Sequence, residues 1–389
     1  MSDLLVVALE ASADAHGAAV LRELRKLVPD LRAFGAGGAR LREEGLDALV
    51  RAEDLSVMGV AEVLPALPRL LDAMDALYDA ARDRRPAAAL LIDSPDFNLR
   101  LARRLRRLRV PVAYFIGPSV WAWRKYRVKQ IARDVQKMLV ILPFEAAFYA
   151  QHGVTATYVG NPLADGISAS RTAARTRIAD GISVSRSDAR TRLFGAAEGP
   201  VLALLPGSRL QEVHRHWPPM LEAARALRLQ LPGLRLVVPV ASTLRRELFG
   251  EPKDVVFVDR AEQALLAADA AVVASGTATL EAALASTPLV VVYRTSWLSW
   301  LAARMLVRVP FIGLPNLLAG RAVTPELLQS NCTAETIAKE AAPLLADGPV
   351  RTAQLQGLRE VRDKLLPPGA KGAARTAAEE LATLFGAPA

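Results

Sequence analysis

The 389-residue chain is poor in cysteine and in long apolar runs, and each lack excludes a class of protein. Cys332 is the only cysteine, so no disulfide can form within the chain, which is typical of a reducing compartment. The chain contains no run of 18 or more apolar residues without charge, which argues against a transmembrane helix. The first residues, MSDLLVVALEASADAHG, lack a basic segment and indicate a buried strand rather than a signal peptide. We therefore expect a cytoplasmic location, free or at a membrane surface.

Motifs that bind metals and dinucleotides are also missing. No aspartate lies two positions from another, so the D-x-D motif of metal-dependent sugar transferases is absent. Among the four histidines, His214 and His216 alternate at the start of an expected helix and do not share a face, which disfavours a metal site. The EASAD segment after the first strand lacks the glycine pattern of a dinucleotide fingerprint, which disfavours a nicotinamide enzyme. The sequence predicts no metal and no cofactor.

Positive charge is abundant. The net charge is +9, which favours an anionic partner such as nucleic acid, acidic lipid or a phosphorylated substrate. Six arginines lie within 100–109, a run most typical of a solvated helix face. Residues 121–133 (WAWRKYRVKQIAR) combine tryptophans with basic residues, a mixture that suits a membrane interface or a lipid phosphate.

Continuous apolar runs alternate with helical patterns, which predicts an α/β fold with parallel sheets covered on both faces. The expected strands lie at 4–11, 31–38, 87–95, 110–116, 137–143 and 156–162, and then at 201–206, 235–240, 255–259, 270–275 and 288–294. We expect two Rossmann-like domains facing a cleft, because ligands of such sheets bind at the carboxyl ends of the strands.

The two series of strands also suggest domain boundaries. We expect an N-terminal domain over 1–163, a linker over 164–198, a C-terminal domain over 199–345, and helices over 346–389 that pack back toward the N-terminal domain. Within the linker, residues 164–178 and 179–193 match at 11 positions and form a tandem duplication. This duplication is too short for a solenoid, and we assign it no chemistry.

Two strand-to-helix turns in the second half are candidates for binding phosphate. In LPGSR (205–209), Ser208 and Arg209 stand where a helix begins, and helix N-termini and arginine both favour anions. The bland alternative is a turn with a solvated arginine. In ASGTATLE (274–281), the small residues Ser275, Gly276 and Thr277 could cradle a diphosphate, although many such turns look alike.

Carboxylates follow one strand of the first half. In IDSPDFN (92–98), Asp93 lies at a strand end and could act as a general base, or could simply cap a turn. For Asp96 the turn cap is the better interpretation. Residues 295–320 begin with Trp297 and Trp300 and predict either a half-buried interfacial helix or a core helix with an exposed arginine edge.

Eight segments in order give the chain a family resemblance. They are EASAD (10–14), VMGVAEVLP (57–65), IDSPDFN (92–98), GPSVWAWR (117–124), LPFEAAFY (142–149), LPGSRLQEV (205–213), ASGTATLE (274–281) and LPNLLAGR (314–321). Together they resemble the lipid-A-disaccharide synthase family, which consists of inverting glycosyltransferases of GT-B-type fold. PSVWAWR and LPNLLAG are the specific segments, and the resemblance runs from about residue 4 to beyond 330.

The resemblance implies a reaction and its partners. UDP-2,3-diacylglucosamine would donate its sugar to 2,3-diacylglucosamine 1-phosphate, giving the β-1,6-linked disaccharide 1-phosphate of lipid A and UDP. The enzyme would need no metal and would work at the cytoplasmic face of the anionic inner membrane of a Gram-negative bacterium. No nucleic acid is expected as a partner, and the resemblance allows a homodimer.

The resemblance also implies roles for individual residues. Asp93 would take the proton of the acceptor hydroxyl, and Arg209 would stabilise the charge on the departing UDP. The nucleotide sugar would be bound by Ser208, Arg209, Ser275, Gly276, Thr277, Glu281 and Asn316, with Glu281 on the ribose. The acceptor would be bound in the N-terminal domain by Glu10, Ser12, Met58, Ser119 and Trp121, with Val57, Val60, Val63 and Leu64 lining an apolar groove for its acyl chains.

The chain departs from the family pattern where Leu9 and Ala13 replace glycines, and Gly117 stands in place of a serine. If substrate approaches the backbone there, the added side chains would intrude. Three alternatives therefore stand beside the main prediction. They are another UDP-sugar enzyme of the same fold, such as an epimerase; a non-catalytic lipid- or nucleic-acid-binding protein; and a folded but inactive family member.

Overall fold

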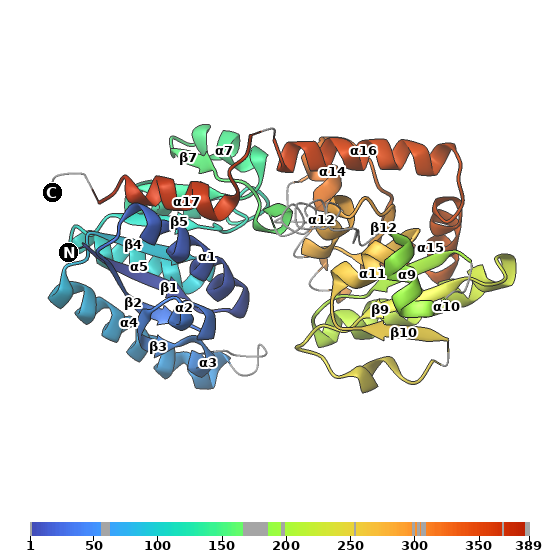
Figure 1. Cartoon of the computed structure of the whole chain (residues 1–389), viewed down its shortest axis with the longest axis horizontal. Coiled ribbons are helices and arrows are strands. Elements are labelled where there is room, and N and C mark those ends of the chain that lie inside the picture. The colour runs from blue at the N-terminus through green and yellow to red at the C-terminus, as the bar shows by residue number, and fades with distance from the viewer. Residues whose placement is uncertain are drawn as a thin grey trace. The chain divides into compact units, whose positions relative to one another are not determined.

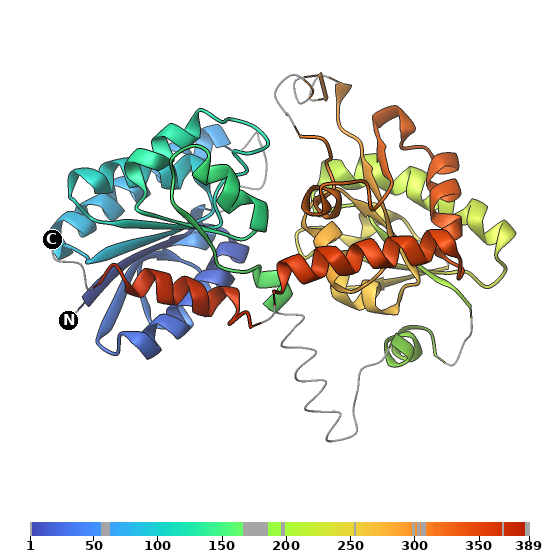
Figure 2. The same cartoon turned by 90° about the horizontal axis from the view of Figure 1, so that it is seen from above.

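The computed structural model describes residues 2–55, 63–165, 186–195, 199–252, 254–297, 300–301, 304, 309–367 and 369–385. The chain forms two compact units (Figures 1 and 2). Unit 1 comprises Met1–Asp165 together with Gly369–Ala389, and unit 2 comprises Gly166–Pro368. Residues 346–365, which we grouped with the final helices, therefore belong to unit 2, and only the last helix belongs to unit 1.

Unit 1 contains a seven-stranded parallel sheet in the order β3-β2-β1-β4-β5-β6-β7. Its strands are β1 (Ser2–Ala8), β2 (Leu31–Gly37), β3 (Leu46–Arg51), β4 (Ala88–Ile92), β5 (Val112–Phe115), β6 (Lys137–Val140) and β7 (Ala156–Tyr158). Sequence analysis missed β3, because this edge strand is buried on one side only and never forms a continuous apolar run.

Helices cover both faces of this sheet. They are α1 (Ala11–Leu27), α2 (Ala39–Glu43), α3 (Ala52–Leu55), α4 (Val63–Arg84), α5 (Pro95–Arg107), α6 (Arg127–Asp134), α7 (Pro143–Ala150) and α17 (Ala373–Ala382). Strand side chains alternate between two buried clusters, so that Leu5 and Val7 face α4 and α5 while Leu4 and Val6 face α1 and α17. The C-terminal helix α17 packs against α1, and both are labelled in Figure 1.

Unit 2 contains a six-stranded parallel sheet in the order β10-β9-β8-β11-β12-β13. Its strands are β8 (Val201–Leu205), β9 (Arg235–Pro239), β10 (Val255–Val258), β11 (Ala270–Ala274), β12 (Leu289–Tyr293) and β13 (Glu326–Leu328). The main helices are α9 (Arg186–Phe194), α10 (Leu210–Gln230), α11 (Ala261–Ala267), α12 (Thr277–Leu284), α14 (Leu314–Ala319), α15 (Ala334–Ala341) and α16 (Pro349–Leu365). The three-residue edge strand β13 is too short to show a pattern in the sequence.

The segment that we considered for an interfacial helix is described only in part. Trp297 is helical and 71% exposed, and Leu301 is also exposed. Residues 305–308 lie outside the described residues. The LPNLLAG part forms the separate short helix α14. Among the described helices, none is both long enough and apolar enough to cross a bilayer.

Candidate functional site

The sheet of unit 1 reverses its strand order between β1 and β4, and this reversal brings Glu10 and Asp93 together. Because Ala8 at the end of β1 pairs with Ile92 at the end of β4, the residues that follow both strands leave the same edge side by side. Glu10 is exposed at the start of α1. Its charge is close enough to raise the pKa of Asp93.

The backbone at Asp93 is held in an unusual conformation. Asp93 and Ser94 have φ values of 52° and 42°, in the left-handed region that residues with side chains rarely adopt. The Asp93 carbonyl oxygen accepts hydrogen bonds from the Tyr114 hydroxyl at 2.6 Å and from the Asn98 side-chain amide at 2.8 Å. Pro95 then begins α5. These contacts fix where the Asp93 carboxylate stands.

The environment of Asp93 makes its carboxylate a stronger base. Burial, and then the negative charge of Glu10, raise its pKa, although a hydrogen bond from the Ser94 backbone works in the opposite direction. A carboxylate with a raised pKa accepts a proton more readily once it is ionised.

The loop after β5 is tied to its surroundings at both ends. Trp121 donates its indole N–H to the buried Glu145 at 3.0 Å, and the other oxygen of Glu145 accepts the Leu142 backbone N–H at 3.0 Å. Burial raises the pKa of Glu145 to about 7. At the other end of the loop, Arg124 and Arg127 form ion pairs with Asp96, for which sequence analysis favoured a turn cap.

Of the remaining acceptor candidates, Ser12 is exposed in the first turn of α1 and Ser119 is exposed in the loop after β5. Met58, Val57 and Val60 lie outside the described residues, and Val63 and Leu64 open α4.

Leu9 and Ala13, the two positions where the sequence departs from the resemblance, have buried side chains. Leu9 is 7% exposed and packs with the strand residues of one apolar cluster, while Ala13 is 1% exposed and packs in the other. Both side chains therefore contribute to the core of unit 1. Asp14, from the same segment, is buried and accepts the backbone N–H groups of Gly38, Arg40 and Leu41, so it caps α2.

Unit 2 reverses its strand order between β8 and β11, which brings its two phosphate-binding candidates together. Leu205 pairs with Val273, so the turn at Pro206–Arg209 and the turn at Ser275–Thr277 leave neighbouring strands at the same edge. Parallel α/β sheets place their ligands at such reversals.

The turn after β8 contains an internal anion that sequence analysis missed. Glu212 accepts the backbone N–H groups of Ser208 at 3.0 Å and Arg209 at 3.2 Å, so these donors are already used. The Arg209 guanidinium is 85% exposed and lies 3.6 Å from Glu212. Arginine is therefore the group at this turn that is available to a ligand, while Glu212 holds the turn. Glutamate three residues after the N-cap residue, here Arg209, is a known capping signal.

The turn after β11 remains open. Gly276 has a φ of 153° and precedes α12, and both Gly276 and Thr277 are exposed. The Ser275 hydroxyl donates to the carbonyl of Ile312 at 3.1 Å, which ties this turn to the approach to α14. Glu281 follows one turn into α12, where burial and then the charge of Glu262 raise its pKa.

Asn316 holds a loop together. It is 1% exposed, and its amide donates to Thr324 and Glu326 while its oxygen accepts from the backbone of Val323 and Thr324. Glu326 also accepts the N–H groups of Ile312 and Gly313 at 2.9 Å, so it caps α14. The expected ligand contact through the Asn316 side chain is not visible, because its polar atoms are already bonded.

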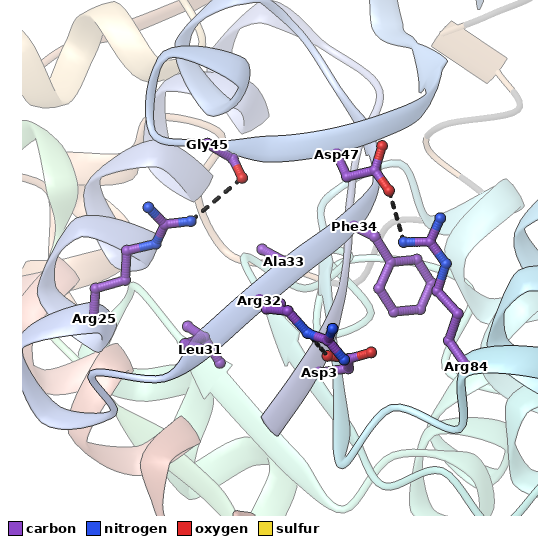
Figure 3. Close-up of a pocket in the computed structure, with 9 residues that line it drawn as sticks. All are labelled: Asp3, Arg25, Leu31, Arg32, Ala33, Phe34, Gly45, Asp47 and Arg84. Atoms are coloured by element: carbon purple, nitrogen blue, oxygen red, sulfur yellow. Dashed lines mark hydrogen bonds and ion pairs between the residues drawn. The ribbon is translucent and has the colours of Figure 1, made fainter. Parts of the chain in front are cut away.

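A cavity of about 630 Å³ lies at the other edge of the unit 1 sheet (Figure 3). It is lined by residues near the starts of β1, β2 and β3 and by Arg25 and Arg84 at the ends of α1 and α4. Arg32 pairs with Asp3 and Arg84 with Asp47, while Arg25 donates to the Gly45 carbonyl. The cavity lies at the amino ends of the strands, whereas Glu10 and Asp93 follow the carboxyl ends of β1 and β4.

Comparison with known proteins identifies the family. A sequence model described as lipid-A-disaccharide synthetase matches residues 4–379. The chain is 50% identical over 379 residues to the lipid-A-disaccharide synthase of Anaeromyxobacter dehalogenans strain 2CP-C, with 94% of each chain covered. It is 47% identical to that of Myxococcus xanthus strain DK1622, with 98% of this chain and 97% of the relative covered. The chain belongs to the lipid-A-disaccharide synthase family.

The fold agrees with this family. The calicheamicin glycosyltransferase CalG4 superposes with a TM-score of 0.60 over 100% of this chain and 99% of its own, at 15% identity, which shows a shared GT-B-type fold. The prediction of fold is thus confirmed by this structure. The family match confirms the predictions of family and glycosyltransferase activity, and with it the epimerase and binding-protein alternatives lose their support. Among the described residues, no three histidine, cysteine, aspartate or glutamate side chains are grouped to hold a metal ion.

Proposed function

We propose that this member of the family transfers the sugar of UDP-2,3-diacylglucosamine to the 6-hydroxyl of 2,3-diacylglucosamine 1-phosphate, with inversion at the anomeric carbon and without a metal. The proposal extends the family assignment to defined substrates. The observation that carries it is what lies at the two reversals of strand order. Glu10 and Asp93 lie close together at the reversal in unit 1, and Arg209 lies close to the Ser275–Thr277 turn at the reversal in unit 2.

Unit 1 would bind the acceptor and supply the base. A sugar hydroxyl is a weak nucleophile at neutral pH, so a carboxylate must take its proton as the new bond forms. Asp93 fits this role because its backbone is held rigidly and its pKa is raised. Glu10, Ser12 and Ser119 are exposed and could bind the sugar or its phosphate, and Trp121 would hold the loop that carries Ser119.

Unit 2 would bind the donor. Negative charge develops on the diphosphate as the glycosidic bond breaks, and preorganised donors that meet this charge lower the barrier. Arg209 and the open N-terminus of α12 at Gly276 and Thr277 would provide them. Glu281 would accept the ribose hydroxyls, and Asn316 would act indirectly by holding the loop before α14.

The substrates carry acyl chains, so the enzyme would work at the cytoplasmic surface of the inner membrane. Trp123 and Tyr126 are exposed in the loop after β5, beside Arg124 and Lys125. Aromatic and basic side chains together suit an anionic membrane surface, where each basic residue contributes on the order of 1 kcal/mol.

An assay of UDP release with each lipid omitted in turn tests the proposal. The purified chain in detergent with EDTA should release UDP only when both lipids are present. The sugar is transferred to the acceptor hydroxyl, and the donor is not hydrolysed by water. UDP release that is independent of the acceptor, or that is abolished by EDTA and restored by a divalent metal, would contradict the proposed transfer. An Arg209→Gln variant should release UDP about 10²- to 10³-fold more slowly, the usual cost of removing a group that stabilises developing charge.

A further inference from the structure

We propose that Arg294 is a second phosphate-binding arginine of the donor site and that His216 positions it. The inference rests on the proposed function, because it takes the ligand to be the diphosphate of a nucleotide sugar. Arg294 follows β12 directly, and β12 is the neighbour of β11 on the side away from β8. Ala274 pairs with Val292, so Arg294 stands level with Gly276 at the edge where the donor site was placed.

The side chain of Arg294 is exposed and available. Within the described part of the chain, the structure records no hydrogen bond or ion pair for its guanidinium. Of the other exposed arginines at this end of the sheet, Arg260 pairs with Glu262 at 2.6 Å, while Arg209 lies 3.6 Å from Glu212 and its side chain stays 85% exposed. A planar guanidinium that lacks a carboxylate partner suits the oxygens of a phosphate.

His216 fixes the backbone of Arg294. Its ring is 1% exposed, with Nδ1 2.9 Å from the Pro206 carbonyl oxygen and Nε2 2.8 Å from the Arg294 backbone nitrogen. A carbonyl can only accept and a backbone N–H can only donate. His216 must therefore be protonated on Nδ1 and unprotonated on Nε2, which accepts the hydrogen bond. The ring therefore acts as a neutral bridge with one defined tautomer.

This bridge connects the two turns that flank β11. Pro206 opens the turn that carries Arg209, and Arg294 is the first residue after β12 on the other side. Two guanidinium groups would thus stand on either side of the Ser275–Thr277 turn, where a diphosphate carries its charge. Burial lowers the pKa of His216, as do the charges of Arg215 and Arg294, while its bond to Pro206 and the charge of Glu212 oppose the change. The bridge is therefore intact at neutral pH.

Calorimetric binding of UDP and of uridine tests the role of Arg294. Arg294→Gln should weaken UDP binding about 10- to 100-fold, the usual effect of losing a charged hydrogen bond, and should leave uridine binding unchanged. Arg294→Lys should recover part of the loss, because it restores the charge without the planar fork. The matched control is Arg359→Gln, which removes an exposed arginine of α16 and should bind UDP like the wild type.

The outcomes separate the two proposals. If the wild type binds UDP and Arg294→Gln binds it equally well, or if uridine binding falls in parallel, the role of Arg294 is overturned while the proposed function stands. If the wild type itself fails to bind UDP, the donor site is wrong and both proposals fall.

A ring ¹⁵N spectrum tests the bridge independently of activity. The resonances of His216, assigned by comparison with His216→Phe, should show a protonated Nδ1 and a bare Nε2 at neutral pH. His216→Phe should raise the KM for the UDP-sugar more than it lowers kcat, with the thermal unfolding midpoint measured alongside. The opposite tautomer, or an unchanged KM in the folded variant, would remove His216 from the role.

Discussion

At the scale of single residues, the proposed base and the proposed cation differ in how they are held. Asp93 is partly buried on a strained backbone and its pKa is raised, whereas Arg209 is exposed on a turn that Glu212 has already capped. Burying a carboxylate costs stability at the pH where it must be ionised to act. The ionised Asp93 side chain should therefore lower the free energy of unfolding at neutral pH, which can be measured.

Replacing Asp93 by asparagine should lower kcat by about 10²- to 10⁴-fold, the usual contribution of a general base. In the wild type, kcat/KM should fall as the pH drops through the raised pKa of Asp93, at a higher pH than an ordinary aspartate would give. The matched control is Asp30→Asn, which changes an exposed aspartate in the turn before β2, at the opposite ends of the strands. Activity of Asp93→Asn close to that of the wild type would exclude Asp93 as the base.

The same substitution should raise the thermal unfolding midpoint at neutral pH. A carboxyl whose pKa is raised on folding favours the folded state below its unfolded pKa, and this contribution is lost as the pH rises through the folded value. The Asp93→Asn variant should thus gain stability over the wild type as the pH rises above about 4, the ordinary pKa of an aspartate. A variant that is less stable than the wild type at pH 7, with no gain across this range, would contradict the burial argument.

At the scale of elements, carboxylates that cap helix N-termini hold the loops around the site. Asp14 caps α2, Glu145 caps α7, Glu212 caps α10 and Glu326 caps α14. Each carboxyl group accepts backbone N–H groups at the start of its helix, where those donors otherwise lack a partner. The loops of the site are in this way attached to the helices of the scaffold.

The loop after β5 should respond to pH through Glu145, whose pKa is raised to about 7 by burial. The wild type should lose stability relative to Glu145→Gln as the pH rises from about 5 to 8, because the buried carboxyl must ionise over this range. Thermal unfolding of the two proteins at a series of pH values measures the difference. A difference that is constant with pH would show that Glu145 does not titrate there.

Removing the Asn316 side chain should destabilise unit 2. Asn316→Ala would leave the buried backbone N–H groups of Val323 and Thr324 without their acceptor, at a cost of about 2–4 kcal/mol in the free energy of unfolding. Denaturant unfolding measures this cost, and Asn331→Ala, in an exposed stretch of the same unit, is the control. A cost similar to that of the control would show that the loop is held by other contacts.

The sequence predicted the parts of the site that local pattern reveals. Asp93 and Arg209 each follow a continuous apolar strand, and the alternation of strands and helices was enough to place them at a sheet edge. The partners of these residues could not be predicted, because the bond from Tyr114 to Asp93 and that from Arg294 to His216 join residues 21 and 78 positions apart. The capping glutamates had a local signal in their spacing from the helix start, but their N-cap residues, Leu142 and Arg209, are not the usual serine or threonine.

At the scale of the whole molecule, the last helix belongs to unit 1, although the helix before it in the sequence belongs to unit 2. Helix α16 belongs to unit 2, and α17 returns to unit 1, where Ala377, Ala378 and Leu381 pack against the cluster that includes α1. The last helix is thus part of the core of the unit that begins with the first strand.

Leu381→Ala should therefore destabilise unit 1, which begins more than 300 residues earlier in the chain. Truncating a fully buried leucine costs about 2–5 kcal/mol, and limited proteolysis should find unit 1 cleaved before unit 2. The control is Thr383→Ala, just beyond the end of α17. Unchanged protection of unit 1 in the leucine variant would show that α17 is dispensable to it.

The structure of the product tests the central claim most directly. The purified chain is incubated with UDP-2,3-diacylglucosamine and 2,3-diacylglucosamine 1-phosphate, and the lipid product is examined by mass spectrometry and NMR. We predict a tetraacyl disaccharide 1-phosphate with a β-1,6 linkage, formed by inversion of the α-linked donor. An α-linked disaccharide, or a free sugar without disaccharide, would contradict the proposed transfer.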